Sequence, residues 1–175
     1  MRYRNDITAE FVRELLDYDP DTGILTWKSR PSITNIGKCW NAKWAGKPAG
    51  SIRPGRYPYV VINLLSKHYY AHRLAWIIYY GCITDSHIDH IDLDTTNNKI
   101  NNLRLASNAN NLCNSIKPVN NTSGVKGVYR QKTGWVACVQ HNRKRHRRWF
   151  RTMGNAIAFA RQMREKWHRS FANHG

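Results

Sequence analysis

A short break in the chain, KPVNNTSG at residues 117–124, constrains most strongly how this sequence can fold. It combines a proline and a glycine with small polar side chains, which interrupt helices and strands. The 175 residues are enough for one ordinary domain or for two small ones. We therefore predict a linker at 117–124, with a small separate domain at residues 125–175.

The net charge differs between the two sides of this break. The chain has 28 Lys or Arg and 11 Asp or Glu residues, which gives +17. Residues 120–175 contain thirteen of the basic residues and one acidic residue, Glu165, whereas residues 1–119 contain fifteen basic and ten acidic residues. Such a charge favours a polyanionic partner, above all nucleic acid, whose condensed counterions basic residues release. A solubilising surface or a membrane-surface patch is the alternative.

Several classes of protein are disfavoured by the composition. No run of about 18 apolar residues exists, so we expect no membrane span and no membrane partner. The N-terminus, MRYRNDITAE, lacks the apolar stretch of a signal peptide. The four cysteines form no C-x-x-C pair, which disfavours a zinc site and a disulfide framework. We expect a cytoplasmic protein that is not secreted and has no small-molecule substrate.

Residues 1–60 are expected to form an extension of one helix, short strands and basic loops. The segment 8–16, TAEFVRELL, has an apolar helical face, and Thr8 can cap it. DPDTG at 19–23 is typical of a turn, and the alternating ILTWK after it predicts a strand. Residues 29–56, rich in Gly, Pro, Lys and Arg, are interpreted as loops and short strands.

Residues 61–116 are expected to form the next structural part. YPYVVINLL and KHYYAHRL predict a hairpin joined at Ser66-Lys67, and LAWIIYYG predicts a short buried helix that Gly81 ends. A further helix is predicted over residues 103–116, with three side chains facing inward: Leu105, Ala109 and Leu112.

The polar stretch between these helices, HIDHIDLDTTNNKINNL at 87–103, contains two His, three Asp and four Asn residues. An EF-hand calcium loop that starts at Asp92 would need Gly at its sixth position and Glu at its twelfth. Asn97 and Leu103 occupy these positions, so we reject the calcium loop. A catalytic metal site and a simple polar connection remain.

Two neighbouring residues favour the catalytic metal site. Ile88 to Asp92 alternates like a strand, so Asp89 and His90 point to opposite faces unless the strand is distorted or ends there. The carboxylate can bind a hard cation, and a neutral imidazole beside it can accept a proton from water. Asn110 or Asn111, on the following helix, could supply a second oxygen ligand.

These residues resemble the HNH nucleases, in the branch whose final position is Asn rather than His. That family has an Asp-His pair on a strand, an Asn in the loop, the letters NLR and a further Asn on a helix. The chain matches it with Asp89-His90, Asn102-Leu103-Arg104 and Asn111. AHRL at 71–74 and LLDYDPDTGILTWK at 15–28 also resemble phage-type relatives, so the resemblance covers roughly residues 8–115.

The resemblance implies a role for each matched residue. His90 would be the general base that activates the attacking water, and Asn102 would pin the loop and orient His90. Asp89 and Asn111 would bind one divalent cation, Mg²⁺ or Mn²⁺, in a fold of a hairpin plus a helix around the metal. Because these are oxygen ligands, zinc is not expected.

Alternatives remain open for these residues. His90 could be a strand histidine satisfied by the backbone, and Asn102 could simply cap a helix. Asn111 competes with Asn110 and Asn108 as the ligand. His72 could orient a phosphate, although a structural hydrogen bond in the core is the favoured interpretation.

The residues after the break predict a compact module of three strands and one helix. The strands are expected at 127–131, 134–140 and 145–150, and the helix follows with an apolar face made of Ala156, Ala160, Met163, Trp167 and Phe171. Basic residues such as Arg164 are expected elsewhere on that helix. Alternation directs Trp135, Ala137 and Val139 toward the helix and Val136, Cys138 and Gln140 outward.

NTSGVKGVY, GWVACV, RWF and the closing helix resemble the DNA-binding domain of plant ethylene-response factors, of the APETALA type. In that family one face of the sheet lies in the major groove of double-stranded DNA. The residues that this implies for DNA binding are Tyr129, Gln131, Cys138, Gln140, Arg147, Trp149 and Arg151. Four other basic residues would contact phosphate or solvent: Arg143, Lys144, Arg145 and Arg148.

Together these patterns predict an α+β protein. It would comprise an N-terminal extension (1–60), a ββα-metal nuclease core (61–116), a linker (117–124) and a basic sheet-plus-helix DNA-binding domain (125–175). The predicted function is that of a metal-dependent, site-recognising DNA endonuclease of the homing type, as found in phage. The alternative is a sequence-specific DNA-binding or regulatory protein that does not cleave.

Overall fold

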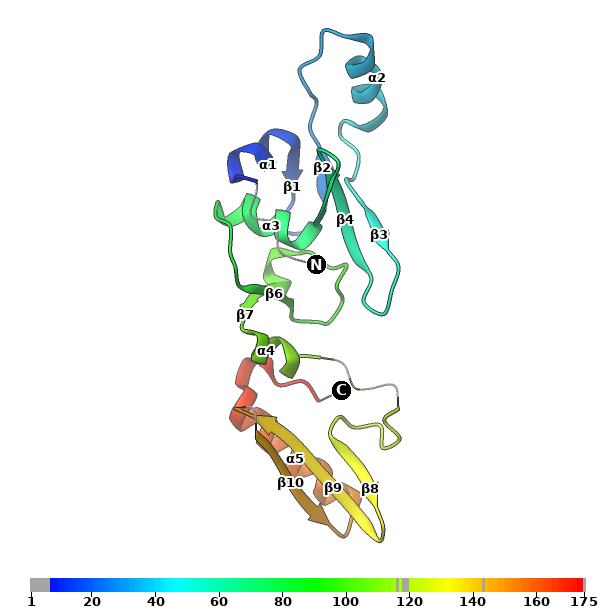
Figure 1. The fold of residues 1–175 in the computed structure, drawn as a ribbon, viewed down its shortest axis with the longest axis vertical. Coiled ribbons are helices and arrows are strands. Elements are labelled where there is room, and N and C mark those ends of the chain that lie inside the picture. The colour runs from blue at the N-terminus through cyan, green and yellow to red at the C-terminus, as the bar shows by residue number, and fades with distance from the viewer. Residues whose placement is uncertain (1–6, 116, 118–119, 143, 175) are drawn as a thin grey trace. The chain divides into compact units, whose positions relative to one another are not determined.

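The computed structural model describes residues 7–115, 117, 120–142 and 144–174. Contacts divide it into two compact units, residues 1–105 and 106–175. Within the described residues, helices accompany small antiparallel sheets of two or three strands (Figure 1). This mixture agrees with the expected α+β class. No helix in that part of the chain is long and apolar enough to cross a membrane.

The first unit begins with the predicted helix. Helix α1 (Ala9–Leu15) starts after Thr8, whose hydroxyl accepts a hydrogen bond from the backbone N–H of Phe11 at 3.2 Å. This bond satisfies one of the N–H groups that a helix leaves without an intrahelical partner. Strands β1 (Leu16–Tyr18) and β2 (Leu25–Trp27) follow and pair across the DPDTG turn.

Residues 29–56 contain a helix that the sequence does not predict. Helix α2 (Asn35–Trp44) is capped by Thr34, and none of its residues is buried. It therefore lacks the buried apolar stripe by which most helices are recognised in a sequence. The Asn41 side chain fixes it to the preceding segment, because its amide accepts from the Arg30 N–H at 3.0 Å and donates to the Arg30 carbonyl at 2.8 Å.

A three-stranded antiparallel sheet comes next, formed by β3 (Ser51–Arg53), β4 (Tyr59–Leu64) and β5 (Lys67–Tyr70) with β4 in the centre. The predicted hairpin is present, but its turn lies at Leu65-Ser66, one residue earlier than expected. Strand β5 is also shorter than predicted. Helix α3 (Ala71–Tyr80) takes over at Ala71, so His72 lies on a helix, and Gly81 ends that helix with a φ of 71°.

The first unit has one hydrophobic core. It joins side chains of α1, β1 and β2 to those of β4, α3 and the strand β7 described below. The buried residues that link these elements include Val12, Leu16, Leu25, Ile62, Leu74 and Leu103. The N-terminal segment therefore packs together with the segment that contains His90 and is not a separate appendage.

The predicted helix over residues 103–116 is wrong in its first part. Leu103–Ala106 form strand β7, which pairs with β6 (His87–His90), and the short helix η1 (Ile100–Asn102) precedes it. Helix α4 covers only Asn108–Cys113, after the cap Ser107. Pairing with β6 overrides a weak helical pattern that is rich in asparagine. The three side chains predicted to face inward are exposed: Leu105, Ala109 and Leu112.

The second unit contains the predicted module. Strands β8 (Val128–Gln131), β9 (Gly134–His141) and β10 (Lys144–Phe150) form an antiparallel sheet with β9 in the centre. Helix α5 (Met153–His168) packs on it, and η2 (Arg169–Phe171) follows. The expected inward residues are confirmed: Trp135, Ala137 and Val139 pack with Ala156 and Ala160 of α5.

Arg164 differs from the expectation that it lies away from the buried side of α5. It is 2% exposed, and its guanidinium donates a hydrogen bond to the backbone carbonyl of Lys126. The Lys126 ammonium in turn donates to the carbonyls of Cys113 at 2.8 Å and Ser115 at 2.6 Å. Burial, and then the nearby Arg164, lowers the pKa of Lys126 to about 8. A polar clamp thus holds α5 and the residues after α4 together.

Candidate functional site

The polar stretch after β6 folds into a compact loop. The Asp92 carboxylate accepts a hydrogen bond from the Asp94 N–H at 2.9 Å, and the Asp94 carboxylate accepts from the Thr96 N–H at 2.9 Å and from its hydroxyl at 2.6 Å. Turns of this kind fold the backbone without a ladder of strand hydrogen bonds. Asp92 and Asp94 therefore serve the turn.

Asn102 closes this loop from its far end. Its side-chain oxygen accepts from the Asp92 N–H at 3.0 Å, and its amide donates to the Asp92 carboxylate and to the Asn97 carbonyl, each at 2.8 Å. These bonds tie both sides of the loop to one half-buried side chain. The contact with the imidazole of His90 comes from another residue, Asn98, which sequence reasoning missed.

His90 ends strand β6 and is 4% exposed. Its Nε2 lies 3.3 Å from Oδ1 of Asn98, whose amide nitrogen donates to the Thr96 carbonyl at 3.1 Å. Because the Asn98 amide is oriented in this way, Oδ1 accepts from the Nε2–H of His90, and Nδ1 carries the lone pair. Burial holds the pKa of His90 below its ordinary value, against the opposing effects of Asn98 and Asp92. A neutral imidazole that can accept a proton results.

The loop that carries Asn98 rests on the N-terminal DPDTG turn. The Tyr18 hydroxyl donates to the Asn98 carbonyl at 2.7 Å, and the Ile100 N–H donates to the Pro20 carbonyl at 3.1 Å. Gly23 has a φ of 77°, and a Cβ atom there would lie 2.5 Å from the backbone nitrogen of Lys99. The turn therefore holds Asn98 beside His90. This contact gives a structural reason for the DPDTG sequence at residues 19–23.

His72 lies beside His90 in an aromatic cluster. It is 7% exposed, its ring centroid is 5.1 Å from that of His90, and it stacks on Tyr70 at 5.5 Å. Tyr59 completes the cluster, with its ring 5.5 Å from His72 and 6.2 Å from His90. Burial holds the pKa of His72 well below its ordinary value, and His90 lowers it further. A neutral, packed His72 agrees with a structural role.

Asp89 lies on the same strand and is 6% exposed. Its Oδ2 atom accepts hydrogen bonds from Nε of Arg104 at 2.9 Å and from a terminal guanidinium nitrogen at 2.8 Å. A buried carboxylate needs a compensating positive charge, which Arg104 supplies across the β6–β7 pair. The NLR letters include Arg104, but they do not indicate this ion pair.

The donor set can be tested for a divalent cation. In the described part of the chain, no group of three or more His, Cys, Asp or Glu side chains could hold a metal ion. A site for a hard cation also uses amide and water oxygens, so it does not need three such side chains. One buried carboxylate that already requires a positive partner is a suitable first ligand. Asp89 thus has the chemistry of a metal ligand. Asn111 is exposed on α4 in the second unit, and its pairing with Asp89 stays a prediction.

The second unit presents a polar face on the side of the sheet away from α5. Cross-strand register places Trp149 and Tyr129 on either side of Val136, which is buried, and places Arg147 opposite Cys138. A guanidinium nitrogen of Arg147 donates to the Tyr129 hydroxyl at 2.6 Å, and Trp149 is 53% exposed. The expected outward residues of these strands therefore share one face, although their contact with DNA stays a prediction.

Several basic residues differ from their expected places. Arg145 pairs with Gln140 on the outward face, where only phosphate or solvent contact was expected. Arg148 lies beside Phe150 and Phe159 of the packed side, with its guanidinium 5.5 Å from each ring. Arg151 follows the end of β10 and is exposed. Arg143 falls outside the described residues.

Comparison with known proteins adds to this geometry. A family model described as HNH endonuclease matches residues 69–113, which include Asp89, His90, Asn102 and Asn111. Protein 3.8 of Escherichia phage T7 is 34% identical over 88 residues, which are 49% of this chain and 73% of that protein. No solved structure matches the chain with significance. The family model ends before the second sheet, so the resemblance of that module to plant DNA-binding domains stays a prediction.

Proposed function

We propose that this chain, whose residues 69–113 match the HNH endonuclease family model, is a metal-dependent, site-recognising DNA endonuclease of the homing type. The observation that carries the proposal is the state of His90. It is buried, neutral and oriented by Asn98, and it directly follows the buried carboxylate of Asp89.

His90 acts as the general base. Phosphodiester hydrolysis needs a deprotonated water, and a base works best when its pKa lies near the working pH. The Nδ1 atom of His90 takes the proton from water, while its Nε2–H stays hydrogen-bonded to Asn98. Asn102 supports this step at a distance, because it closes the loop that carries Asn98.

Asp89 would hold a divalent cation, Mg²⁺ or Mn²⁺, with Asn111 as a second oxygen ligand. When bound, the cation neutralises charge at the phosphate and at the leaving oxygen. To bind the cation, the Asp89 carboxylate must give up its ion pair with Arg104 or contact both the guanidinium and the cation. An Arg104 displaced from Asp89 keeps its positive charge near the scissile phosphate, where that charge is useful.

The second unit would recognise double-stranded DNA with the outward face of its sheet, as the resemblance to ethylene-response factors implies. Arg147 and Gln140 have side chains that can hydrogen-bond base edges, and Trp149 and Tyr129 can pack on sugars and bases. The bond from Arg147 to Tyr129 fixes the guanidinium before DNA arrives, which lowers the entropic cost of binding. Arg145 belongs to the same outward face of the sheet, because it pairs with Gln140.

A cleavage assay tests the proposal. The purified protein is incubated with a supercoiled plasmid that carries the DNA flanking its own gene, in Mg²⁺, Mn²⁺ or EDTA. Nicked or linear plasmid should form with either ion and not with EDTA. If the protein binds this plasmid but no product forms with either ion, the endonuclease proposal is refuted.

One observation favours the second candidate, a DNA-binding protein without cleavage. The Arg104 guanidinium already neutralises Asp89, the carboxylate that a metal would need. In that case Mn²⁺ would not bind to the full chain, whereas DNA would bind normally. Isothermal titration with Mn²⁺ alone separates the two functions.

A further inference from the structure

The segment between Asp21 and Asp85 has an unusual charge pattern. It contains nine Lys or Arg residues and no Asp or Glu. The ion pair between Lys28 and Asp17 involves an acidic residue outside the segment. A polyanion that approached the surface formed by this segment would therefore meet no repulsive carboxylate from the segment itself.

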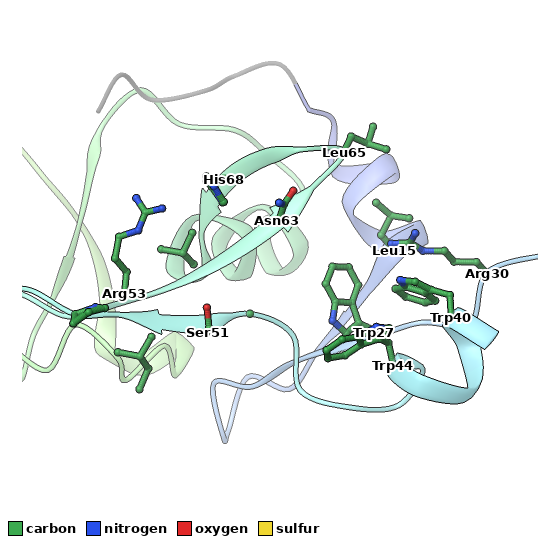
Figure 2. A pocket seen from close by; sticks show the side chains of 14 residues that line it. Leu15, Trp27, Arg30, Trp40, Trp44, Ser51, Arg53, Asn63, Leu65 and His68 are labelled. Carbon is green, nitrogen blue, oxygen red and sulfur yellow. The ribbon is translucent and has the colours of Figure 1, made fainter. Parts of the chain in front are cut away.

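Residues of this segment, together with Leu15, line a cleft of about 780 Å³ in the first unit. Figure 2 shows Trp27, Trp40 and Trp44 gathered at one end, beside the strands that carry Ser51 and Asn63. This volume lies within the roughly 300–1,000 Å³ of small-ligand sites. His90 and its ring neighbours Tyr59, Tyr70 and His72 do not line the cleft.

The floor of the cleft is the outer face of the β3–β4–β5 sheet. Asn63 and His68 are cross-strand partners there, and Arg53 pairs with Tyr59. The alternate residues of β4, Ile62 and Leu64, face the hydrophobic core. Strand alternation thus leaves Asn63, His68 and Arg53 on the outer face, together with the apolar Val61. The three polar side chains carry hydrogen-bonding groups that can contact a ligand.

The wall of the cleft is aromatic and cationic. Trp27 and Trp40 meet edge to face at 5.6 Å, and the Arg30 guanidinium lies 3.7 Å from the centroid of the Trp40 ring. The Nε of Arg30 is buried and has no hydrogen-bond partner among the described residues. Trp44 is 40% exposed, and the Lys43 ammonium lies 5.1 Å from its ring. A contiguous exposed apolar surface rimmed by polar groups often marks a binding site.

We propose that this cleft binds an unpaired stretch of nucleic-acid strand, with bases stacked on the tryptophans and phosphates held by Arg30 and Arg53. Sites for single strands combine a positive groove with aromatic rings, because every base has a face that can stack. Duplex DNA buries its base faces and leaves the tryptophans without partners. An acidic peptide would satisfy the charges but not the exposed ring of Trp44.

The outer face of the sheet also leads toward His90. Tyr70 pairs with Val61 on this face, and the rings of Tyr59 and Tyr70 lie 5.0 Å apart. Tyr59 in turn lies 6.2 Å from the ring of His90. From Asn63 to Tyr59 the strand rises about 13 Å, at about 3.3 Å per residue. A strand held in the cleft can therefore extend to the candidate active site, and this last step rests on the proposed function.

The test uses full-length protein that carries His90→Ala, in Mg²⁺, so that cleavage does not consume the probe. The probe is a fluorescent 12-nucleotide oligothymidine, and binding is followed by anisotropy. Trp44→Ala should weaken binding about 5- to 150-fold, which is the effect of losing one stacking partner. Arg53→Ala should reduce the slope of log affinity against log salt by about 0.7. Ile33→Ala, at an exposed position that does not line the cleft, is the matched control and should change neither value.

The location is tested by photo-crosslinking the same protein to an oligothymidine that contains 5-iodouracil. Crosslinked peptides should include residues 40–53. The proposal is overturned if every crosslink maps to residues 120–175, or if Trp44→Ala binds the single strand as tightly as the control. It is also overturned if an acidic peptide, and not the oligonucleotide, binds in a manner that depends on Trp44. A protein that binds the strand in the cleft but never cleaves DNA would refute the proposed function and leave this inference standing.

Discussion

The loop that presents Asn98 to His90 depends on one side chain, that of Asn102. The substitution Asn102→Ala removes three hydrogen bonds, two of them to Asp92 and one to the Asn97 carbonyl. A neutral hydrogen bond contributes about 1 kcal/mol net and one to a charged group about 1.5 kcal/mol or more. The sum is about 3.5 kcal/mol, and because the loop is partly exposed, water recovers part of it, leaving a loss of about 2 kcal/mol.

A loss of about 2 kcal/mol lowers the unfolding temperature by about 10 °C in a unit of this size. Thermal unfolding followed by circular dichroism measures the shift. Asn101→Ala is the matched control, because Asn101 is the exposed neighbour on the same short helix. It should shift the midpoint by no more than about 2 °C, as surface substitutions do. Cleavage by Asn102→Ala should also fall below that of the control, because Asn98 loses its fixed position under His90.

Equal unfolding temperatures for Asn102→Ala and Asn101→Ala would refute this account of the loop. A second variant keeps the reasoning testable, since Asn102→Asp preserves the shape but places a carboxylate 2.8 Å from that of Asp92. It should be at least as unstable as Asn102→Ala at neutral pH, because two like charges then face each other. It should recover stability as the pH falls and the carboxyls become protonated.

Gly23, Arg104 and Lys126 each make a close contact whose loss can be measured. Gly23→Ala should cost at least about 2 kcal/mol of unfolding free energy, because its φ is positive and its Cβ would meet the Lys99 backbone; an unchanged thermal midpoint would contradict this. Arg104→Gln should lower the unfolding temperature in EDTA, because Asp89 loses the guanidinium that compensates its charge, and Mn²⁺ should restore that temperature. By calorimetry Mn²⁺ should bind the variant about tenfold tighter than wild type, a gain of about 1.4 kcal/mol. Equal or weaker Mn²⁺ binding would argue against Asp89 as a ligand. The pKa of Lys126 is lowered to about 8, so above that pH the folded chain binds fewer protons than the unfolded chain. The stability of wild type relative to Lys126→Met should therefore rise between pH 7 and pH 10 in thermal melts. A constant or opposite difference would contradict the burial of Lys126.

The second unit could be predicted almost fully from the sequence. Short alternating segments, turns and an apolar helical face are local patterns, and they give the three strands and α5 correctly. Arg164 escaped prediction because its burial depends on a distant carbonyl, that of Lys126. A charged side chain in a helical pattern is ordinarily exposed, and only tertiary structure reveals its partner.

The secondary structure of the first unit is harder to predict from the sequence, for two different reasons. Helix α2 buries none of its residues, so periodicity carries no signal there. Leu103–Ala106 reads as the start of a helix but pairs with β6, because a sheet partner outweighs local propensity. Helix α2 therefore offers no apolar pattern to detect, and the conformation of Leu103–Ala106 depends on its sheet partner.

The sequence predicts the central residues of the candidate site, but not the residues that position them. Asp89 and His90 could be selected from the pattern, because a carboxylate beside an imidazole has evident chemistry. Asn98 could not be distinguished from its neighbouring asparagines, since their roles depend on how the loop folds. Tyr18 and Gly23 support the loop from about eighty residues away, which no local spacing can indicate.

The central claim is that His90 is the base of a DNA endonuclease. Single-turnover cleavage of a DNA fragment that carries the recognised site tests it directly, in Mg²⁺ and with enzyme in excess. His90→Ala should bind the fragment as tightly as wild type and cleave it about 100- to 10,000-fold more slowly, the usual contribution of a general base. Cleavage by His90→Ala at the wild-type rate, with equal binding, would contradict the claim.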